Sequence, residues 1–154
     1  MTRVLFVCLG NICRSPSAEG VFRKALVDAG LACEVEVDSC GIGDWHVGKA
    51  PDERAQKAAL CRGVDISELK ARTLRPEDFD AFDYVLGMDR DNLDAIRAMA
   101  PDGCRARIGL FLEYAEVSET EVPDPYFGGE QGFEHVLDLI EAASQGLIEA
   151  LRKR

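Results

Sequence analysis

The stretch from Val4 to Glu19 reads VLFVCLGNICRSPSAE, and the order of its parts decides the fold. Four apolar residues predict a strand that is buried on both faces. A loop with a glycine and an asparagine follows, and Pro16 suits the first turn of a helix. Backbone N–H groups of such a loop, together with the start of a helix, can point inward at one anion. The stretch therefore predicts a strand, a loop and a helix that together bind a phosphate group.

The residue types in this loop indicate chemistry as well as binding. A helix start and a nearby arginine favour a thiolate, so Cys8 at the end of the strand is a candidate nucleophile. Arg14 offers a planar fork that can contact two phosphoryl oxygens at once. Ser15 can donate its hydroxyl to Cys8, and Gly10 and Asn11 tolerate the left-handed backbone of a tight loop. The other members of the predicted phosphate-binding loop are Leu9, Ile12 and Cys13.

Composition favours a single soluble domain that spans residues 1–154, with 47% hydrophobic and 30% charged residues. The net charge of -10 argues against nucleic acid and against anionic membrane surfaces as partners. No apolar run is long enough to cross a membrane, and the first residues lead directly into a predicted strand. We therefore expect no signal peptide and a cytoplasmic location.

The chain contains six cysteines, and without an export signal they do not predict a disulfide framework. Because no pair has the C-x2-C spacing, we expect no metal site. Four of them are expected to be small core or half-buried residues: Cys33, Cys40, Cys61 and Cys104. Cys13 is either a packing residue beneath the loop or a redox partner that forms a disulfide with Cys8 on oxidation.

Strand and helix signals alternate along the chain. Strands are predicted at residues 3–8, 33–39 and 82–88 and within 104–112, and helices at 17–29, 51–62, 76–81, 89–99 and 129–154. This order predicts an α/β fold of three layers, with a four-stranded parallel sheet and helices on both faces. Ligands of such folds bind beyond the carboxyl ends of the strands, which is where Cys8 is expected.

A second candidate group lies in the predicted loop at residues 119–132, which contains VPDPYFGG at 122–129. Asp124 stands between two prolines, which restrict its backbone. If a thiolate attacks phosphorus, the leaving oxygen needs a proton, and an aspartic acid above the loop can supply it. The alternative is an ordinary aspartate in a turn before a helix.

Aromatic residues on two loops could form the walls of a slot for a planar substrate ring. They are Trp45, Tyr126 and Phe127, and for Phe127 local packing is an equal alternative. His46, beside Trp45, could touch the substrate or lie at the solvated rim of this slot, and the rim is the preferred interpretation.

Together these motifs resemble the low-molecular-weight protein tyrosine phosphatases over nearly the whole chain. The segment VCLGNICRSP at residues 7–16 matches the active-site loop of that family, and DPY at 124–126 matches its acid loop. Secondary landmarks also fit, at residues 38–39, 45, 48, 51–52, 54, 70–72, 83–86 and 88–89.

The resemblance implies metal-independent hydrolysis of phosphotyrosine and aryl phosphate monoesters through a phosphocysteine, without a cofactor. Cys8 would be the nucleophile, Arg14 the phosphate clamp and Asp124 the general acid and then base. Ser39 would bond to Asn11 and support the loop. The implied partners are phosphotyrosine proteins or small aryl phosphates, with inorganic phosphate as product and inhibitor. The oligomeric state stays open.

Two departures from the family pattern stand out. Leu69 occupies a position where many relatives have a histidine that supports the Asn–Ser hydrogen bonds, so the rigidity of the loop is in question. Phe127 stands where some relatives have a second tyrosine, which could change the substrate preference.

Two other functions compete with the phosphatase. An arsenate reductase of the same fold needs further cysteines to relay a disulfide, but Cys61 and Cys104 lack the expected paired spacing. A phosphotyrosine-binding or redox-sensing module without turnover would be expected to lack the nucleophile or the acid. Because Cys8 and Asp124 are both present, the sequence favours the phosphatase.

Overall fold

The computed structural model describes residues 1–125 and 130–153, and only the backbone of residues 130 and 131. Its sheet contains four strands: β1 (Thr2–Cys8), β2 (Val35–Gly41), β3 (Tyr84–Gly87) and β4 (Arg107–Leu110). They lie in the order β2-β1-β3-β4, and every neighbouring pair is parallel. The predicted four-stranded parallel sheet is confirmed.

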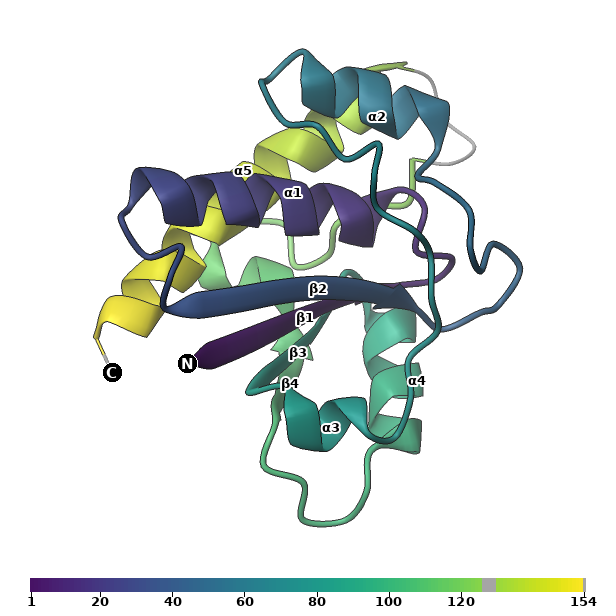
Figure 1. Cartoon of the computed structure of the whole chain (residues 1–154), viewed down its shortest axis with the longest axis vertical. Helices are drawn as coiled ribbons and strands as arrows, with labels where there is room; N and C mark the ends of the chain where they lie inside the picture. Colours follow the sequence, from purple (N-terminus) through teal and green to yellow (C-terminus); the bar gives the residue numbers. More distant parts are fainter. Residues whose placement is uncertain (126–129, 154) are drawn as a thin grey trace.

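Helices cover both faces of this sheet, as predicted (Figure 1). The helices are α1 (Arg14–Asp28), α2 (Glu53–Leu60), α3 (Asp78–Ala81), α4 (Arg90–Met99) and α5 (Glu130–Arg152), with a 3-10 turn, η1 (Phe111–Tyr114). Figure 1 shows α1, α2 and α5 on one side of the sheet and α3 and α4 on the other. Within the described residues, no helix is long and apolar enough to span a membrane.

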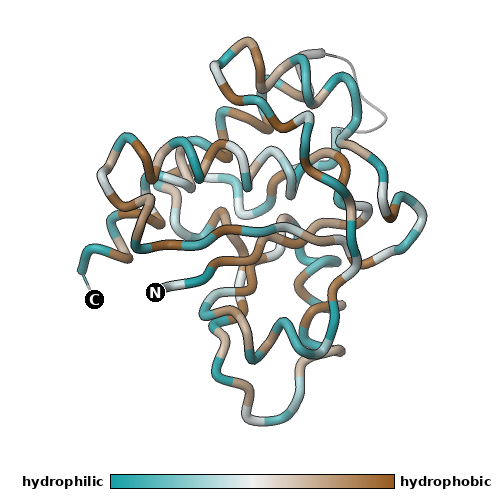
Figure 2. Tube along the Cα trace, in the orientation of Figure 1, coloured by the Kyte–Doolittle hydropathy of each residue, from teal (hydrophilic) through white to brown (hydrophobic). Residues whose placement is uncertain are grey.

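The strand β1 supplies both layers of the core because its side chains alternate between the two faces. Val4 and Phe6 belong to the larger cluster beneath α1 and α5, whereas Leu5 and Val7 belong to the smaller cluster beneath α3 and α4. Hydrophobic stretches of the chain run along the central strands (Figure 2). This burial on both faces explains why residues 4–7 are uninterruptedly apolar.

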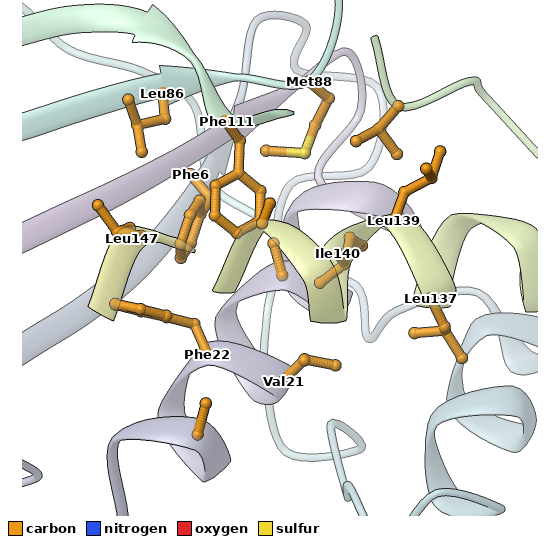
Figure 3. Packing of buried hydrophobic residues seen from close by; sticks show 14 of the residues in the cluster. Phe6, Val21, Phe22, Leu86, Met88, Phe111, Leu137, Leu139, Ile140 and Leu147 are labelled. Carbon is orange, nitrogen blue, oxygen red and sulfur yellow. The ribbon is translucent and has the colours of Figure 1, made fainter. Parts of the chain in front are cut away.

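Aromatic rings form the centre of the larger cluster (Figure 3). The Phe6 ring contacts Phe22 of α1 edge to face, with centroids 5.6 Å apart, and its centroid lies 4.6 Å from that of Phe111. Leu147 and Ile140 of α5 close the same cluster from the helix side. Helices α1 and α5 pack on this face of β1, and β2 and β3 pair with its two edges. These contacts fix the position of the carboxyl end of β1.

Several boundaries differ from the sequence expectation. Helix α1 begins at Arg14 rather than at residue 17, because the loop leads directly into the helix and Pro16 needs no N–H in the first turn. Strand β2 is displaced two residues toward the carboxyl end, since it stays paired with β1 until Cys8 meets Gly41. Strand β4 ends at Leu110, where the chain turns into η1.

Two cysteines were predicted wrongly. Cys33 and Cys61 are exposed, whereas Cys40 is buried and Cys104 is partly buried. Cys33 lies in the turn before β2, and Cys61 follows the last residue of α2, so neither side chain faces the core.

Three segments far apart in the sequence meet beyond the carboxyl ends of β1 and β3. Residues 9–13 follow β1, Met88 and Asp89 follow β3, and the segment that contains Val122 returns to them. The Val122 N–H donates to the Met88 carbonyl at 2.8 Å. The topology thus places the predicted phosphate loop beside the segment that carries Asp124.

Candidate active site

The loop after β1 wraps around the Cys8 thiol. Cys8 is 3% exposed, its sulfur accepts a hydrogen bond from the Asn11 N–H at 3.3 Å, and it lies 3.0 Å from the Ser15 hydroxyl. Asn11 has φ +57, the left-handed conformation that the sequence led us to expect in this loop. Among the described residues no side chain caps the start of α1, which leaves that helix end open toward the loop.

The side chain of Asn11 fixes the loop from inside. Its amide nitrogen donates to Ser15 Oγ at 2.8 Å and to Ser39 Oγ at 3.0 Å. Its amide oxygen accepts the backbone N–H of Arg72 at 3.0 Å. These bonds form in a chain that has Leu69 at the histidine position of relatives; Leu69 packs instead against the larger core cluster.

The end of β2 lies directly against the loop. A Cβ on Gly41 would approach the backbone N of Asn11 and the backbone C of Gly10 to 3.0 Å, so only glycine allows this contact without a shift. The Ile42 N–H donates to the Cys8 carbonyl at 2.9 Å, and Ser15 Oγ lies 3.2 Å from the Cys40 carbonyl, to which it can donate. Strand β2 thus supports the loop from one side.

Arg14 is almost completely buried, at 2% exposed, and its guanidinium joins all three segments. Its Nη1 donates to Asp89 Oδ2 at 2.6 Å and to the Val122 carbonyl at 3.0 Å. Its Nη2 lies 3.7 Å from Asp124 Oδ2. Burial lowers the pKa of Arg14, but Cys8 and the carboxylates of Asp89 and Asp124 outweigh it and raise the pKa, so the guanidinium stays charged.

Asp89 has two roles, of which sequence reasoning found one. Its Oδ1 accepts the Asn92 N–H at 2.8 Å and caps α4, as predicted. Its Oδ2 orients Arg14, which was not expected. The signal was available, since Met88 and Asp89 follow the strand next to β1 and the carboxyl ends of parallel strands meet at one edge.

These groups surround a single pocket of about 240 Å³. Its lining consists of Cys8, Leu9, Gly10, Ile12, Cys13, Arg14, Trp45, His46 and Asp124. Trp45, 65% exposed, stands at the mouth of the pocket, and the Asp124 side chain is 38% exposed. Tyr126 and Phe127 lie outside the described residues.

Three lining residues were not predicted as part of the walls. Leu9 and Ile12 were expected only as loop members, but both residues line the pocket, as does His46, for which the solvated rim had been preferred over contact with substrate. A loop whose N–H groups point inward turns side chains outward, and this geometry is the signal that could have identified Leu9 and Ile12.

Cys13 lies in the pocket lining with Cys8 and is 5% exposed. Burial raises the pKa of its thiol to about 12, with further contributions from Asp52, Cys8 and Asp124, so it stays protonated at neutral pH. Cys40, although next to Ser39, packs into the smaller core cluster on the other face of the sheet. Cys61 and Cys104 are absent from the described lining of the pocket.

Comparison with known proteins gives one consistent result. The family model for low molecular weight phosphotyrosine protein phosphatase matches residues 3–154. A low molecular weight protein-tyrosine-phosphatase of Bacillus subtilis is 41% identical over 154 residues, covering 99% of this chain and 97% of its own. The low molecular weight phosphotyrosine protein phosphatase of Sus scrofa is 40% identical, with 97% and 95% coverage.

Solved structures have the same fold. A protein tyrosine phosphatase from Entamoeba histolytica, crystallised with Hepes in the active site, has a TM-score of 0.96 at 38% identity, covering 99% of this chain and 98% of its own. Vibrio vulnificus Wzb, in complex with benzylphosphonate, has a TM-score of 0.85 at 29% identity, with 97% and 98% coverage. The chain therefore belongs to the low molecular weight phosphotyrosine protein phosphatase family and is an enzyme of that class.

Proposed function

We propose that this protein hydrolyses phosphotyrosine and related aryl phosphate monoesters through a covalent phosphocysteine at Cys8. The observation that carries the proposal is the composition of one pocket. It combines a buried thiol, a buried charged guanidinium and an aspartate at the mouth, Cys8, Arg14 and Asp124. Nucleophile, charge stabiliser and proton donor are the groups that a phosphoryl transfer to a side chain requires.

In the first step the Cys8 thiolate attacks phosphorus, forming a sulfur–phosphorus bond as the bond to the aryl oxygen breaks. The free side of the Arg14 guanidinium and the inward N–H groups of the loop stabilise the charge on the phosphoryl oxygens. Asp124 donates its proton to the leaving oxygen, so that tyrosine leaves as the neutral phenol.

In the second step water attacks the phosphocysteine, and the Asp124 carboxylate now accepts a proton from this water. The sulfur–phosphorus bond breaks, inorganic phosphate is released and the Cys8 thiolate is restored. Ser15 Oγ, 3.0 Å from the sulfur, stabilises the departing thiolate by donating its hydrogen. Side chains and water supply every proton and electron pair in the two steps, so the proposed mechanism uses no metal or cofactor.

The walls of the pocket support an aromatic substrate. Leu9, Ile12 and Trp45 surround the phosphate loop with apolar surface. A phenyl ring that buries this surface gains roughly 25 cal/mol per Å², a contribution that phosphoserine cannot make. The related Wzb structure holds benzylphosphonate, in which a ring likewise carries a phosphorus group. We therefore propose phosphotyrosine proteins or small aryl phosphates as substrates, and inorganic phosphate as a competing product.

Replacing the nucleophile tests the function most simply. Cys8→Ser should abolish hydrolysis of p-nitrophenyl phosphate while binding of inorganic phosphate remains measurable by calorimetry, because the backbone and Arg14 form the anion site. Cys33→Ser is the matched control, since Cys33 is exposed in the turn before β2, and it should keep full activity. Turnover by Cys8→Ser near the wild-type rate would exclude the phosphocysteine.

Replacing the acid tests the role of Asp124. Asp124→Asn should slow phenyl phosphate far more than p-nitrophenyl phosphate, because only the poorer leaving group depends on a proton. General acid catalysis of this kind is typically worth roughly 10²–10⁴-fold. The measurement is kcat/KM across a series of substituted phenyl phosphates. An equal loss along the whole series would mean that Asp124 is not the acid.

Cys13 is further proposed to protect Cys8 from overoxidation. Peroxide converts the Cys8 thiolate to a sulfenic acid with release of hydroxide, and the Cys13 sulfur then displaces water to form a disulfide. Both thiols line the same pocket. Because burial raises the pKa of Cys13 to about 12, its thiolate is scarce at neutral pH and disulfide closure should become faster as pH rises toward that value.

Mild peroxide should therefore inactivate the wild type reversibly, and peptide mapping of the oxidised protein should show the Cys8–Cys13 pair. Cys13→Ser, at the same dose, should not recover when a thiol reductant is added. Cys61→Ser, which removes an exposed thiol, is the control and should behave as the wild type. Full recovery of Cys13→Ser would leave Cys13 as a packing residue only.

A further inference from the structure

A buried carboxylate lies behind the phosphate loop, outside the pocket lining. Glu19 of α1 is 4% exposed. Its Oε1 accepts the Ser39 hydroxyl at 2.7 Å, and its Oε2 accepts Arg23 Nη2 at 2.8 Å. Burial raises the pKa of Glu19, whereas the hydrogen bonds from Ser39 and Arg23 lower it; Asp38, the other charged group near it, raises it. A buried acid that is held in this way needs a structural or functional reason.

The hydrogen bonds that join Glu19 to Cys8 have a defined direction. The backbone N–H of Arg72 can only donate, so the Asn11 amide oxygen must face it, at 3.0 Å. The Asn11 amide nitrogen therefore donates to both Ser15 Oγ and Ser39 Oγ. Each hydroxyl, having accepted from Asn11, must send its own single hydrogen elsewhere.

The two hydroxyl hydrogens then have few destinations. That of Ser39 goes to the Glu19 carboxylate at 2.7 Å. That of Ser15 goes to the Cys8 sulfur at 3.0 Å or to the Cys40 carbonyl at 3.2 Å. The Arg72 N–H, which can only donate, thus fixes the orientation of the Asn11 amide, and the Glu19 carboxylate, which can only accept, fixes the direction of the Ser39 hydroxyl.

We infer that Glu19 is a positioning residue for the reaction at Cys8: its carboxylate takes the Ser39 hydrogen, so that the Ser39 oxygen stays bonded to Asn11 and Asn11 holds Ser15 beside the sulfur. This inference rests on the proposed function. Glu19 also joins α1 to β2 through Arg23, whose Nη2 donates to the Val37 carbonyl at 2.9 Å. The carboxylate therefore holds the loop between the two elements that flank it.

The substitution E19Q would weaken this arrangement, because it replaces an acceptor-only carboxylate with an amide. If the nitrogen of the new amide faced Ser39, the Ser39 oxygen would accept from two amide groups and its own hydrogen would lose its acceptor. If instead the oxygen of the new amide faced Ser39, its NH₂ group would meet the Arg23 guanidinium, donor against donor. The first arrangement loses the acceptor of the Ser39 hydrogen, and the second loses the bond from Arg23 that holds Glu19 in place. In both, Ser39 and Asn11 are held less firmly, and so is Ser15.

The hydrogen-bond network and the electrostatic field predict opposite shifts of the pH midpoint at which Cys8 is alkylated, which makes the inference testable. Removing a negative charge near Cys8 would, by its field alone, ease formation of the thiolate and lower the pH midpoint at which Cys8 is alkylated. Loss of the Ser15 hydrogen bond would raise that midpoint. The charged groups near Glu19 are Arg23 and Asp38, and Arg72 pairs with Asp38. Arg14, which interacts with Cys8, also interacts with Asp89 and Asp124, and the titratable His46 lines the same pocket. All of these groups stay unchanged in the substitution.

The experiment measures alkylation of Cys8 by iodoacetamide as a function of pH, with mass spectrometry of the Cys8 peptide. E19Q should raise the midpoint by about one pH unit, which corresponds to a tenfold lower thiolate fraction below the midpoint. The kcat for p-nitrophenyl phosphate should fall about tenfold while KM changes little, since the anion site remains. Glu36→Gln, which removes the same charge from an exposed acid of β2 that pairs with Arg3, is the control and should change neither value.

A second variant shows whether Glu19 acts through Ser39. Ser39→Ala should raise the midpoint as well, and E19Q combined with Ser39→Ala should exceed neither single effect. A midpoint that stays the same or falls in E19Q, or single effects that add, would overturn the inference. If E19Q does not fold, an unchanged midpoint in Ser39→Ala has the same consequence. Alkylation requires no turnover, so these outcomes are separate from a failure of the proposed function, which an active Cys8→Ser would reveal.

Discussion

The side-chain amide of Asn11 joins the loop after β1 to two segments that are distant in sequence, and the shape of the loop depends on it. It bonds to Ser15 at the start of α1, four residues away, to Ser39 near the end of β2, and to the backbone at Arg72. These bonds hold Asn11 at φ +57, a conformation that costs energy for most residues other than glycine. In that conformation its N–H points at the Cys8 sulfur. The hydrogen bonds of the Asn11 side chain therefore account both for the left-handed backbone of the loop and for the hydrogen bond that the thiol receives.

Electrostatics in the pocket follow from burying one arginine among carboxylates. The chain carries a net charge of -10, yet the anion site contains a fully charged guanidinium because Asp89 holds Arg14 in place at 2.6 Å. Asp124 lies 3.7 Å from the same guanidinium, close enough to be near a bound phosphate and exposed enough to exchange protons with solvent. Beside them, burial raises the pKa of Cys13 to about 12, so this second thiol of the pocket stays protonated at neutral pH.

The sequence predicted those features that depend on local pattern. Uninterrupted apolar residues in β1 and alternating strand and helix signals were enough for the sheet, its parallel strands and its two helical layers. Local signals gave wrong boundaries where pairing between distant segments determines where an element begins or ends. Strand β2 continues to Gly41 because Gly41 pairs with Cys8, and α1 begins early because the loop turns directly into it. The pattern could not show either contact.

In the candidate site, too, some residues could be selected from local sequence and others could not. Cys8 and Arg14 were selected for their chemistry and spacing, and the structure places both in one pocket. Contacts between distant segments could not be predicted: Asp89 was seen only as a helix cap, and Glu19 only as part of a helix start, since neither its burial nor its bond to Ser39 is visible in one dimension. Exposure was misjudged for Cys33 and Cys61 because a cysteine near the end of an element can face either way.

The central claim is that phosphorus is transferred to Cys8 during turnover. Rapid acid quenching of the enzyme during hydrolysis of p-nitrophenyl phosphate, followed by peptide mass spectrometry, measures this directly. Asp124→Asn is the variant of choice, because loss of the base slows hydrolysis of the intermediate and allows it to accumulate. We expect one phosphoryl group on the peptide that contains Cys8, formed as fast as the first p-nitrophenol is released. Phosphorylation of another residue, or steady turnover with Cys8 unmodified at every quench time, would contradict the mechanism.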